Sequence, residues 1–363
     1  MFYCALGIHY FGDHCTMSLE DILQQESSSA VQAGLLHGIV IAAGRSKGLD
    51  VLWAWGTASL FPVVRPMQPD SIFDMASVTK AVATASACAI SIDKGILSPE
   101  APASLYIPDI GQFPGSEIKV CNLASHCSGY DDRKFYLGGA KNFIERVIKS
   151  PAQRPAEETF EYSCRNFILL GLIVEEITGE NLADFCRKNL FVPAGMHHTL
   201  FGPLSEEISN VVPTQVPAGV ISDEQARIAN RPLGNAGLFS TAEDLALFCR
   251  MILSGGTMGR RSIIRKKGMR WISQSCSPPH LPRKSFGWDM SSCYECSHRP
   301  FGLSDSAIGH SGWTGHSVWI DPEQDLFFIV LTNRSHALKQ NNYEPSKRFR
   351  ARISEILLSY MQQ

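Results

Sequence analysis

The sequence predicts an α+β fold, with one antiparallel sheet formed from both termini and flanked by helices, and a large, mostly helical inserted domain. Segments rich in β-branched and aromatic residues gather near the two ends of the chain, and helical periodicity dominates between them. The 363 residues, 44% of them hydrophobic, suit about two lobes, and a formal net charge of -2 excludes a disordered chain. We expect a sheet domain from residues 18–95 and 285–363, a helical inserted domain from 96–284, and an N-terminal extension from 1–17.

The first predicted elements are a helix and a hairpin. The segment MSLEDILQQ, which opens at Met17, has the amphipathic pattern of a helix. Two strand-like segments then follow between Leu36 and Thr57, with Arg45–Gly48 as the turn between them. This turn also matches G-x-S-x-G, the nucleophile turn of α/β-hydrolases, but that turn leads into a helix and here a second strand follows. We therefore expect an ordinary hairpin turn.

Helices are predicted for most of the middle of the chain. One runs from Asp74 to Gly95, because its apolar residues fall on one face and Gly95 ends it. The helix at 242–254 has Thr241 as its N-cap and two glycines after it. The other clear helical patterns span residues 166–178 and 182–189.

Strand patterns return after Trp288. Residues 317–321 and 326–331 are apolar segments on either side of the turn Pro322–Asp325, and an amphipathic helix follows from about Ser346 to Tyr360. Strands at both ends of the chain, with helices between them, are what predict a single sheet built from the two termini.

Charge and hydropathy exclude two classes of partner. The densest basic cluster, between Arg260 and Lys267, is one short helical face, so we expect no nucleic acid as partner. No uninterrupted run of about 20 apolar residues exists, so no membrane span is expected. The N-terminus is a poor signal peptide, which favours a cytoplasmic location, with export left open. The sequence says nothing about the oligomeric state.

The eleven cysteines are an odd number, and several lie inside apolar helical patterns, which favours reduced thiols. One region has metal-ligand spacing and leaves a zinc-dependent interaction module open as an alternative. We nevertheless expect reduced loop thiols there and no metal or other cofactor. The residues concerned are Cys276, His280, Cys293, Cys296 and His298.

The pattern S-x-x-K of nucleophilic serines occurs three times, at Ser77–Lys80, Ser91–Lys94 and Ser116–Lys119. Only the first opens an apolar helix. A spacing of three places the two side chains one helical turn apart on the same face, and the free N–H groups of the first turn could stabilise an oxyanion. A lysine in apolar surroundings loses solvation, so we expect its pKa to fall and the amine to accept the serine proton.

Two further segments suit the same chemistry. Tyr162 stands at the entry of an apolar helix, where a phenol beside an ammonium can relay protons. In the segment Gly309–His316, small residues lead into a strand, and the backbone N–H of Trp313 could donate to an oxyanion.

Five segments, in order between about Gly38 and Asn333, resemble the penicillin-binding protein and β-lactamase superfamily of serine hydrolases. The resemblance is closest to the branch of class C β-lactamases, D,D-peptidases and related esterases, and it implies a β-lactamase/transpeptidase-like fold. The segments are FDMASVTKAVAT, IKVCNLASHCSGY, FEYSCRNFILLGLIVEEITG, NAGLFSTAEDLALFCRMIL and GHSGWTGHSVWIDPEQDLFFIVLTNR.

The resemblance also implies roles for individual residues. Ser77 would be the acylated nucleophile, Lys80 its proton acceptor and Tyr162 a second proton carrier, and the N–H groups of Ser77 and Trp313 would form the oxyanion hole. Asn235 would line the cleft opposite Ser77. The segment His310-Ser311-Gly312 stands where the family has Lys-Thr-Gly or His-Thr-Gly.

Two positions depart from the family pattern. Cys164 replaces the Asn of Tyr-x-Asn, and a thiol is a weak substitute for an amide that binds the lysine and the substrate. His310 replaces lysine and attracts a substrate carboxylate less strongly. We therefore expect an acyl-enzyme hydrolase of small esters, amides or D-amino-acid peptides. A class C-type β-lactamase and a non-hydrolytic binder or sensor are the alternatives.

Overall fold

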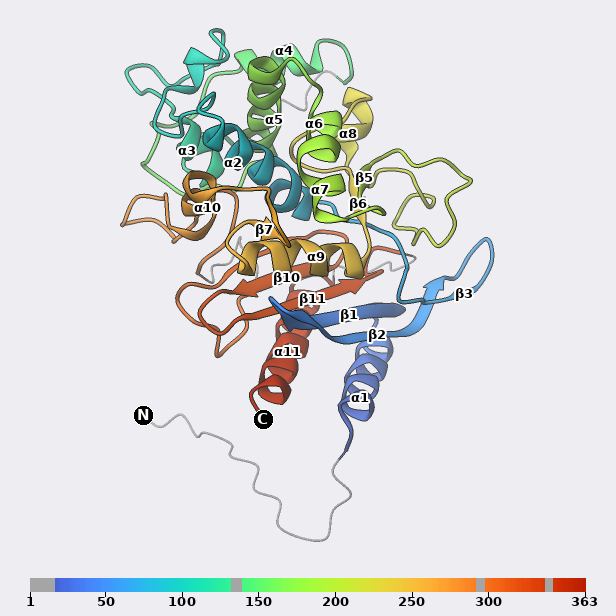
Figure 1. Cartoon of the computed structure of the whole chain (residues 1–363). Coiled ribbons are helices and arrows are strands. Elements are labelled where there is room, and N and C mark those ends of the chain that lie inside the picture. Colours follow the sequence, from blue (N-terminus) through green and yellow to red (C-terminus); the bar gives the residue numbers. More distant parts are fainter. Residues whose placement is uncertain (1–16, 132–138, 292–297, 337–341) are drawn as a thin grey trace, which may run out of the picture.

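The computed structural model describes residues 17–131, 139–291, 298–336 and 342–363, and it has the predicted α+β arrangement (Figure 1). Its centre is a six-stranded antiparallel sheet in the order β3-β2-β1-β11-β10-β9. The sheet joins the two ends of the chain where β1 pairs with β11, from Ile39 opposite Thr332 to Gly44 opposite Phe327. Its strands are β1 (Gly38–Arg45), β2 (Gly48–Ser59), β3 (Arg65–Pro66), β9 (Ile308–Gly312), β10 (His316–Asp321) and β11 (Leu326–Thr332).

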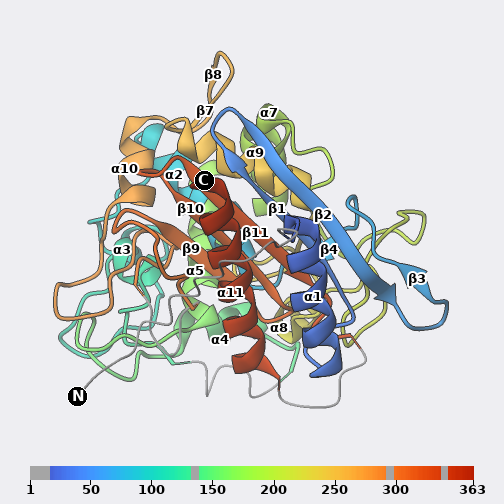
Figure 2. The same cartoon turned by 90° about the horizontal axis from the view of Figure 1, so that it is seen from below.

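Helices cover both faces of this sheet. Helices α1 (Leu19–Gln32) and α11 (Tyr343–Met361) lie against the face that is seen from below in Figure 2. Helix α9 (Ala242–Leu253) packs on the opposite face, under the helical lobe. Because both faces are covered, β11 is buried along its whole length, and its sequence LFFIVLT is continuously apolar, apart from its terminal threonine.

The helical lobe lies beyond α9 (Figure 1). It includes two π-helical segments, at Lys80–Ala85 and Arg187–Phe191, a 3-10 turn at Ala103–Leu105, and two small sheets. The sheets are β4 (Phe73–Asp74), β6 (Leu238–Ser240) and β5 (Leu200–Phe201), and the hairpin of β7 (Thr257–Met258) and β8 (Arg261–Ser262). Its remaining helices are α2 (Ser86–Asp93), α3 (Val120–Ala124), α4 (Phe143–Lys149), α5 (Cys164–Thr178), α6 (Leu182–Cys186), α7 (Val192–Ala194), α8 (Glu224–Ala229) and α10 (Lys266–Ser273).

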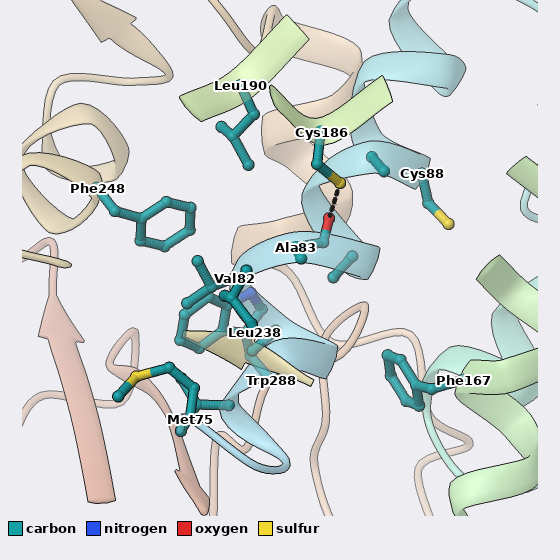
Figure 3. Close-up of a cluster of buried hydrophobic side chains, with 14 of the residues drawn as sticks. Met75, Val82, Ala83, Cys88, Phe167, Cys186, Leu190, Leu238, Phe248 and Trp288 are labelled. Carbon is teal, nitrogen blue, oxygen red and sulfur yellow. Dashed lines mark hydrogen bonds between the residues drawn. The ribbon is translucent and has the colours of Figure 1, made fainter. Parts of the chain in front are cut away.

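The core of this lobe surrounds the segment that runs from Met75 into α2 (Figure 3). Large side chains such as Phe248 and Trp288 pack against it, and the Cys186 thiol donates to the Ala83 carbonyl at 3.7 Å. Cys88 is fully buried here, which confirms the prediction that the helical cysteines act as small hydrophobic residues.

The hairpin turn at Arg45–Gly48, the first helix and the last helix are confirmed. The predicted start of the helix at Asp74 is wrong, because Phe73 and Asp74 form strand β4 and pair with Ser240 and Phe239. Ala76, next along the chain, has a φ of 45°, which a right-handed helix excludes. The helix therefore begins only after this kink. Among the residues described, no helix is both long and apolar enough to cross a bilayer.

Candidate active site

Ser77 and Lys80 lie in the first turn after the kink at Ala76. The Lys80 ammonium donates to the Ser77 hydroxyl, with Nζ 2.9 Å from Oγ. Lys80 is completely buried, whereas Ser77 is partly exposed. A π-helical turn runs from Lys80 to Ala85, and such turns are frequent at functional sites. The predicted pair is therefore formed, with a buried amine and an accessible alcohol.

Lys80 has two more acceptors. Its Nζ is 2.9 Å from the Asn235 carbonyl oxygen and 3.5 Å from the Cys164 sulfur. Together with Ser77 these make three acceptors, which matches the three N–H bonds of an ammonium. Burial lowers the pKa of Lys80, but the Cys164 and Tyr162 groups raise it more, and the pKa lies above its usual value. The expectation that this pKa falls is therefore wrong, because the lysine exchanges water for polar neighbours and not for apolar ones.

Tyr162 completes this group. Its ring lies beside Lys80, with Nζ 5.1 Å from the ring centroid. Burial raises the pKa of Tyr162. The charge of Lys80 and the hydrogen bond with Ser77 lower it, but by less, so the pKa lies above its usual value. At neutral pH the phenol is therefore protonated and Lys80 is an ammonium.

His126 orients Tyr162. The two rings stack with centroids 4.5 Å apart. The His126 Nδ1 accepts from the Ser163 backbone N–H at 3.1 Å, and the Asn166 amide, whose oxygen is held by a serine hydroxyl, is 3.1 Å from the same nitrogen. Burial lowers the pKa of His126 well below its usual range, so the ring is neutral. The sequence does not predict this stacking, because His126 lies 36 residues before Tyr162.

Close backbone packing positions Cys164 and Asn235. Cys164 is the first residue of α5, directly after Tyr162 and Ser163. A Cβ at Gly234 would lie 2.0 Å from the Phe167 carbonyl oxygen, so only glycine allows this approach to α5. The Asn235 side chain is fully buried, and its amide lies 3.3 Å from Asp223 Oδ1. Asn235 thus contacts Lys80 through its backbone carbonyl, while its side chain points toward Asp223.

The predicted third motif is strand β9 itself, at the edge of the main sheet. His310 is buried, and its ring centroid is 6.4 Å from that of Tyr162. Burial lowers the pKa of His310 from 6.5 to about 4. Ser311 pairs with Ser317, so strand alternation places its side chain on the opposite face of β9 from His310.

Gly312 brings β9 against the segment that carries Ser77. A Cβ on Gly312 would lie 2.6 Å from the Met75 carbonyl oxygen. Trp313 follows, with its side chain 45% exposed. Within the described residues, the backbone N–H groups of Ser77 and Trp313 donate no hydrogen bond, so both are free for an incoming oxyanion.

A buried ion pair behind the site has no signal in the sequence. Lys284 and Asp289 pair at side-chain exposures of 1% and 3%. Asp289 is hydrogen-bonded to Gly309 of the β9 strand, and Lys284 lies 5.1 Å from the ring centroid of Phe160, close to Tyr162 in sequence. The negative charge of Asp289 raises the pKa of His310 and the positive charge of Lys284 lowers it, and both effects are smaller than that of burial.

The structure thus brings Ser77, Lys80, Tyr162, Cys164 and His310 together, with the Asn235 carbonyl at Lys80 and the Gly312–Trp313 turn beside them. No metal cluster occurs among the residues that the structure describes. Of the residues named for the alternative of a zinc site, Cys293 and Cys296 lie outside the described residues. His280 hydrogen-bonds with the Glu157 carbonyl, and His298 pairs with Glu344.

Known proteins share both sequence and fold with this chain. The family model described as Beta-lactamase matches residues 26–351. An N-acetylmuramyl-L-alanine amidase of Bacillus subtilis (strain 168) is 29% identical over 310 residues, which cover 74% of this chain and 69% of the relative.

Two solved structures have the same fold. Simvastatin synthase (LovD) from Aspergillus terreus superposes with a TM-score of 0.74 at 15% identity, over 96% of this chain and 100% of the other. EstCE1, a hydrolase with promiscuous acyltransferase activity, has a TM-score of 0.72 at 19% identity, over 92% and 98% of the two chains. The match of the family model over most of the chain shows that the protein belongs to the β-lactamase family of serine hydrolases.

Proposed function

We propose that this protein hydrolyses small esters, amides or D-amino-acid peptides through an acyl-enzyme on Ser77. The observation that carries the proposal is the 2.9 Å contact between Ser77 Oγ and the buried Lys80 Nζ, with Tyr162 beside them. Ser77 attacks the substrate carbonyl carbon and the alcohol or amine leaves. Water, or another acceptor, then releases the acyl group from the serine ester.

Proton transfer follows from the charge state of the resting site. Lys80 is an ammonium and Tyr162 a phenol, because the pKa of each lies above its usual value. One proton must therefore leave this pair before the pair can accept the Ser77 proton during attack. The accepted proton then passes to the leaving group, which makes the pair a base in one half of the step and an acid in the other.

Uncharged acyl donors suit the site best. With its pKa lowered by burial to about 4, His310 is neutral at pH 7 and offers a substrate carboxylate no positive charge. This favours esters, simple amides and peptides with a blocked C-terminus over β-lactams and peptides with a free C-terminus, which carry a carboxylate. The similar proteins support hydrolysis of amide or ester bonds, because they include an amidase and a hydrolase with acyltransferase activity.

The test is intact-mass spectrometry of the whole protein after exposure to a fluorophosphonate and to p-nitrophenyl esters, with product release followed by absorbance. We expect one adduct per chain, on Ser77, and turnover of the ester. Ser77→Ala should abolish both, whereas Ser116→Ala, at the serine of another S-x-x-K match, should change neither. Labelling that survives in Ser77→Ala contradicts the assignment of the nucleophile.

One of the two alternatives has specific support. The thiol of Cys164, 3.5 Å from Lys80 Nζ where relatives carry an amide, favours a non-hydrolytic binder that forms the adduct but releases no product. A class C-type β-lactamase is the other alternative, and rapid turnover of a chromogenic cephalosporin would support it over an esterase. Stoichiometric labelling without ester turnover would favour the binder.

A further inference from the structure

Asp74 holds the kink that precedes the nucleophile. Its carboxylate Oδ1 accepts from the Ala76 backbone N–H at 2.8 Å, and Oδ2 accepts from the Ser222 N–H at 2.7 Å. Asp74 is 1% exposed, so no water competes for these bonds. Ala76 has the left-handed φ of 45°, which costs a non-glycine residue about 1–2 kcal/mol. The carboxylate therefore stabilises a strained turn one residue before Ser77.

The backbone carbonyl of the same residue holds the turn that carries Trp313. It accepts from the Thr314 hydroxyl at 2.9 Å and from His316 Nε2 at 2.9 Å. Thr314 and His316 are each 1% exposed and lie on the two sides of Gly315. Asp74 is thus bonded through its side chain to the segment before Ser77 and through its backbone to the segment after Trp313.

These two segments supply the free N–H groups of Ser77 and Trp313. An oxyanion is stabilised only if both donors lie within hydrogen-bonding distance of one oxygen position, and small displacements weaken that stabilisation steeply. We propose that Asp74 is a positioning residue that fixes these two N–H groups relative to each other for the developing oxyanion. This inference rests on the proposed function, because it presumes attack by Ser77.

Thr314→Val is the first variant, because it removes only the hydroxyl that reaches the Asp74 carbonyl and keeps the shape of a buried side chain. We expect kcat for ester hydrolysis to fall about 10-fold or more while KM changes less than 3-fold, since the oxyanion forms only during reaction. Thr314→Ser keeps the hydroxyl and should restore most of kcat. Affinity for a boronic acid, which forms a tetrahedral adduct on serine, should fall in parallel with kcat/KM.

Asp74→Asn tests the hydrogen bonds that the Asp74 side chain accepts from Ala76 and Ser222. Its amide oxygen can still accept from Ala76, but its NH2 group faces the Ser222 N–H, so one bond is lost at nearly constant volume. We expect a 10- to 100-fold loss of kcat. The side-chain bonds and the backbone bonds of Asp74 fix the same distance between the two N–H groups. The double variant with Thr314→Val should therefore lose less kcat than the product of the two single losses.

Thr178→Val is the matched control, because the Thr178 hydroxyl also donates to a backbone carbonyl, that of Val174 at 2.7 Å, at the far end of α5 and outside the Trp313 turn. It should retain kcat. An equal loss in the Thr178 variant, or unchanged kcat in Thr314→Val and Asp74→Asn with intact thermal unfolding, overturns the role of Asp74. A wild-type protein with neither ester turnover nor a boronic acid adduct would instead show that the proposed function has failed, and the inference with it.

Discussion

Acid should destabilise this protein through His310. Burial lowers the pKa of His310 from 6.5 to about 4, so between these values the unfolded chain binds a proton that the folded chain excludes. The unfolded state therefore gains free energy as the pH falls. The stability due to this group is fully present above pH 6.5 and is lost as the pH drops through that window. Lowering the pH from 7 to 5 should cost about 2 kcal/mol of unfolding free energy from His310 alone.

Replacing His310 by glutamine removes this dependence and keeps a donor for the Ser311 carbonyl, which lies 2.9 Å from His310 Nδ1. We expect the loss of stability between pH 7 and pH 5, measured by urea unfolding with circular dichroism, to be about 2 kcal/mol smaller in His310→Gln than in the wild type. His197→Gln, at an exposed imidazole, controls for the loss of a histidine. The same pH dependence in His310→Gln and in the wild type would refute the reasoning.

Further predictions concern the reaction. Tyr162→Phe should lower kcat about 10²- to 10⁴-fold with little change in KM, because a proton carrier is lost, and near-normal turnover would exclude that role. Since the pKa values of Lys80 and Tyr162 lie above their usual values, kcat/KM should rise with pH through the neutral range, and a plateau below pH 7 contradicts this. Gly312→Ala should lower both activity and the urea midpoint, by about 1–3 kcal/mol in stability, because its Cβ would lie 2.6 Å from the Met75 carbonyl oxygen. Cys164→Asn should raise amide over ester turnover about 10-fold, since an amide is a better donor and acceptor than a thiol, and an unchanged ratio would show that the thiol is not limiting.

Much of the fold could be predicted because its elements differ in periodicity. Strands β1, β2, β10 and β11 are apolar or aromatic segments with turn residues between them, and helices α5 and α9 have amphipathic or apolar patterns with recognisable ends. The start of the helix after Asp74 could not be predicted in this way. The residues from Phe73 to Ala76 are mostly apolar and fit the pattern of the helix that follows. Strand pairing with β6 and the kink at Ala76 nevertheless keep them out of that helix.

Part of the candidate site could also be predicted. Residue type and spacing identified Ser77 with Lys80, and Tyr162 at the entry of a helix, because short-range geometry fixes which side chains share a face. The charge state of Lys80 could not be predicted, since it depends on the Asn235 carbonyl and the Cys164 thiol, 155 and 84 residues away in the chain.

The sequence by itself determined which segments become strands and helices and which serine and lysine share a helical turn, because these depend on contacts a few residues apart. Only the tertiary structure decided that β9 is an edge strand against the segment before Ser77, that His126 stacks on Tyr162, and that Lys80 has three acceptors. These features depend on which distant backbone and side-chain groups replace water around a buried group, and local spacing carries no information about that.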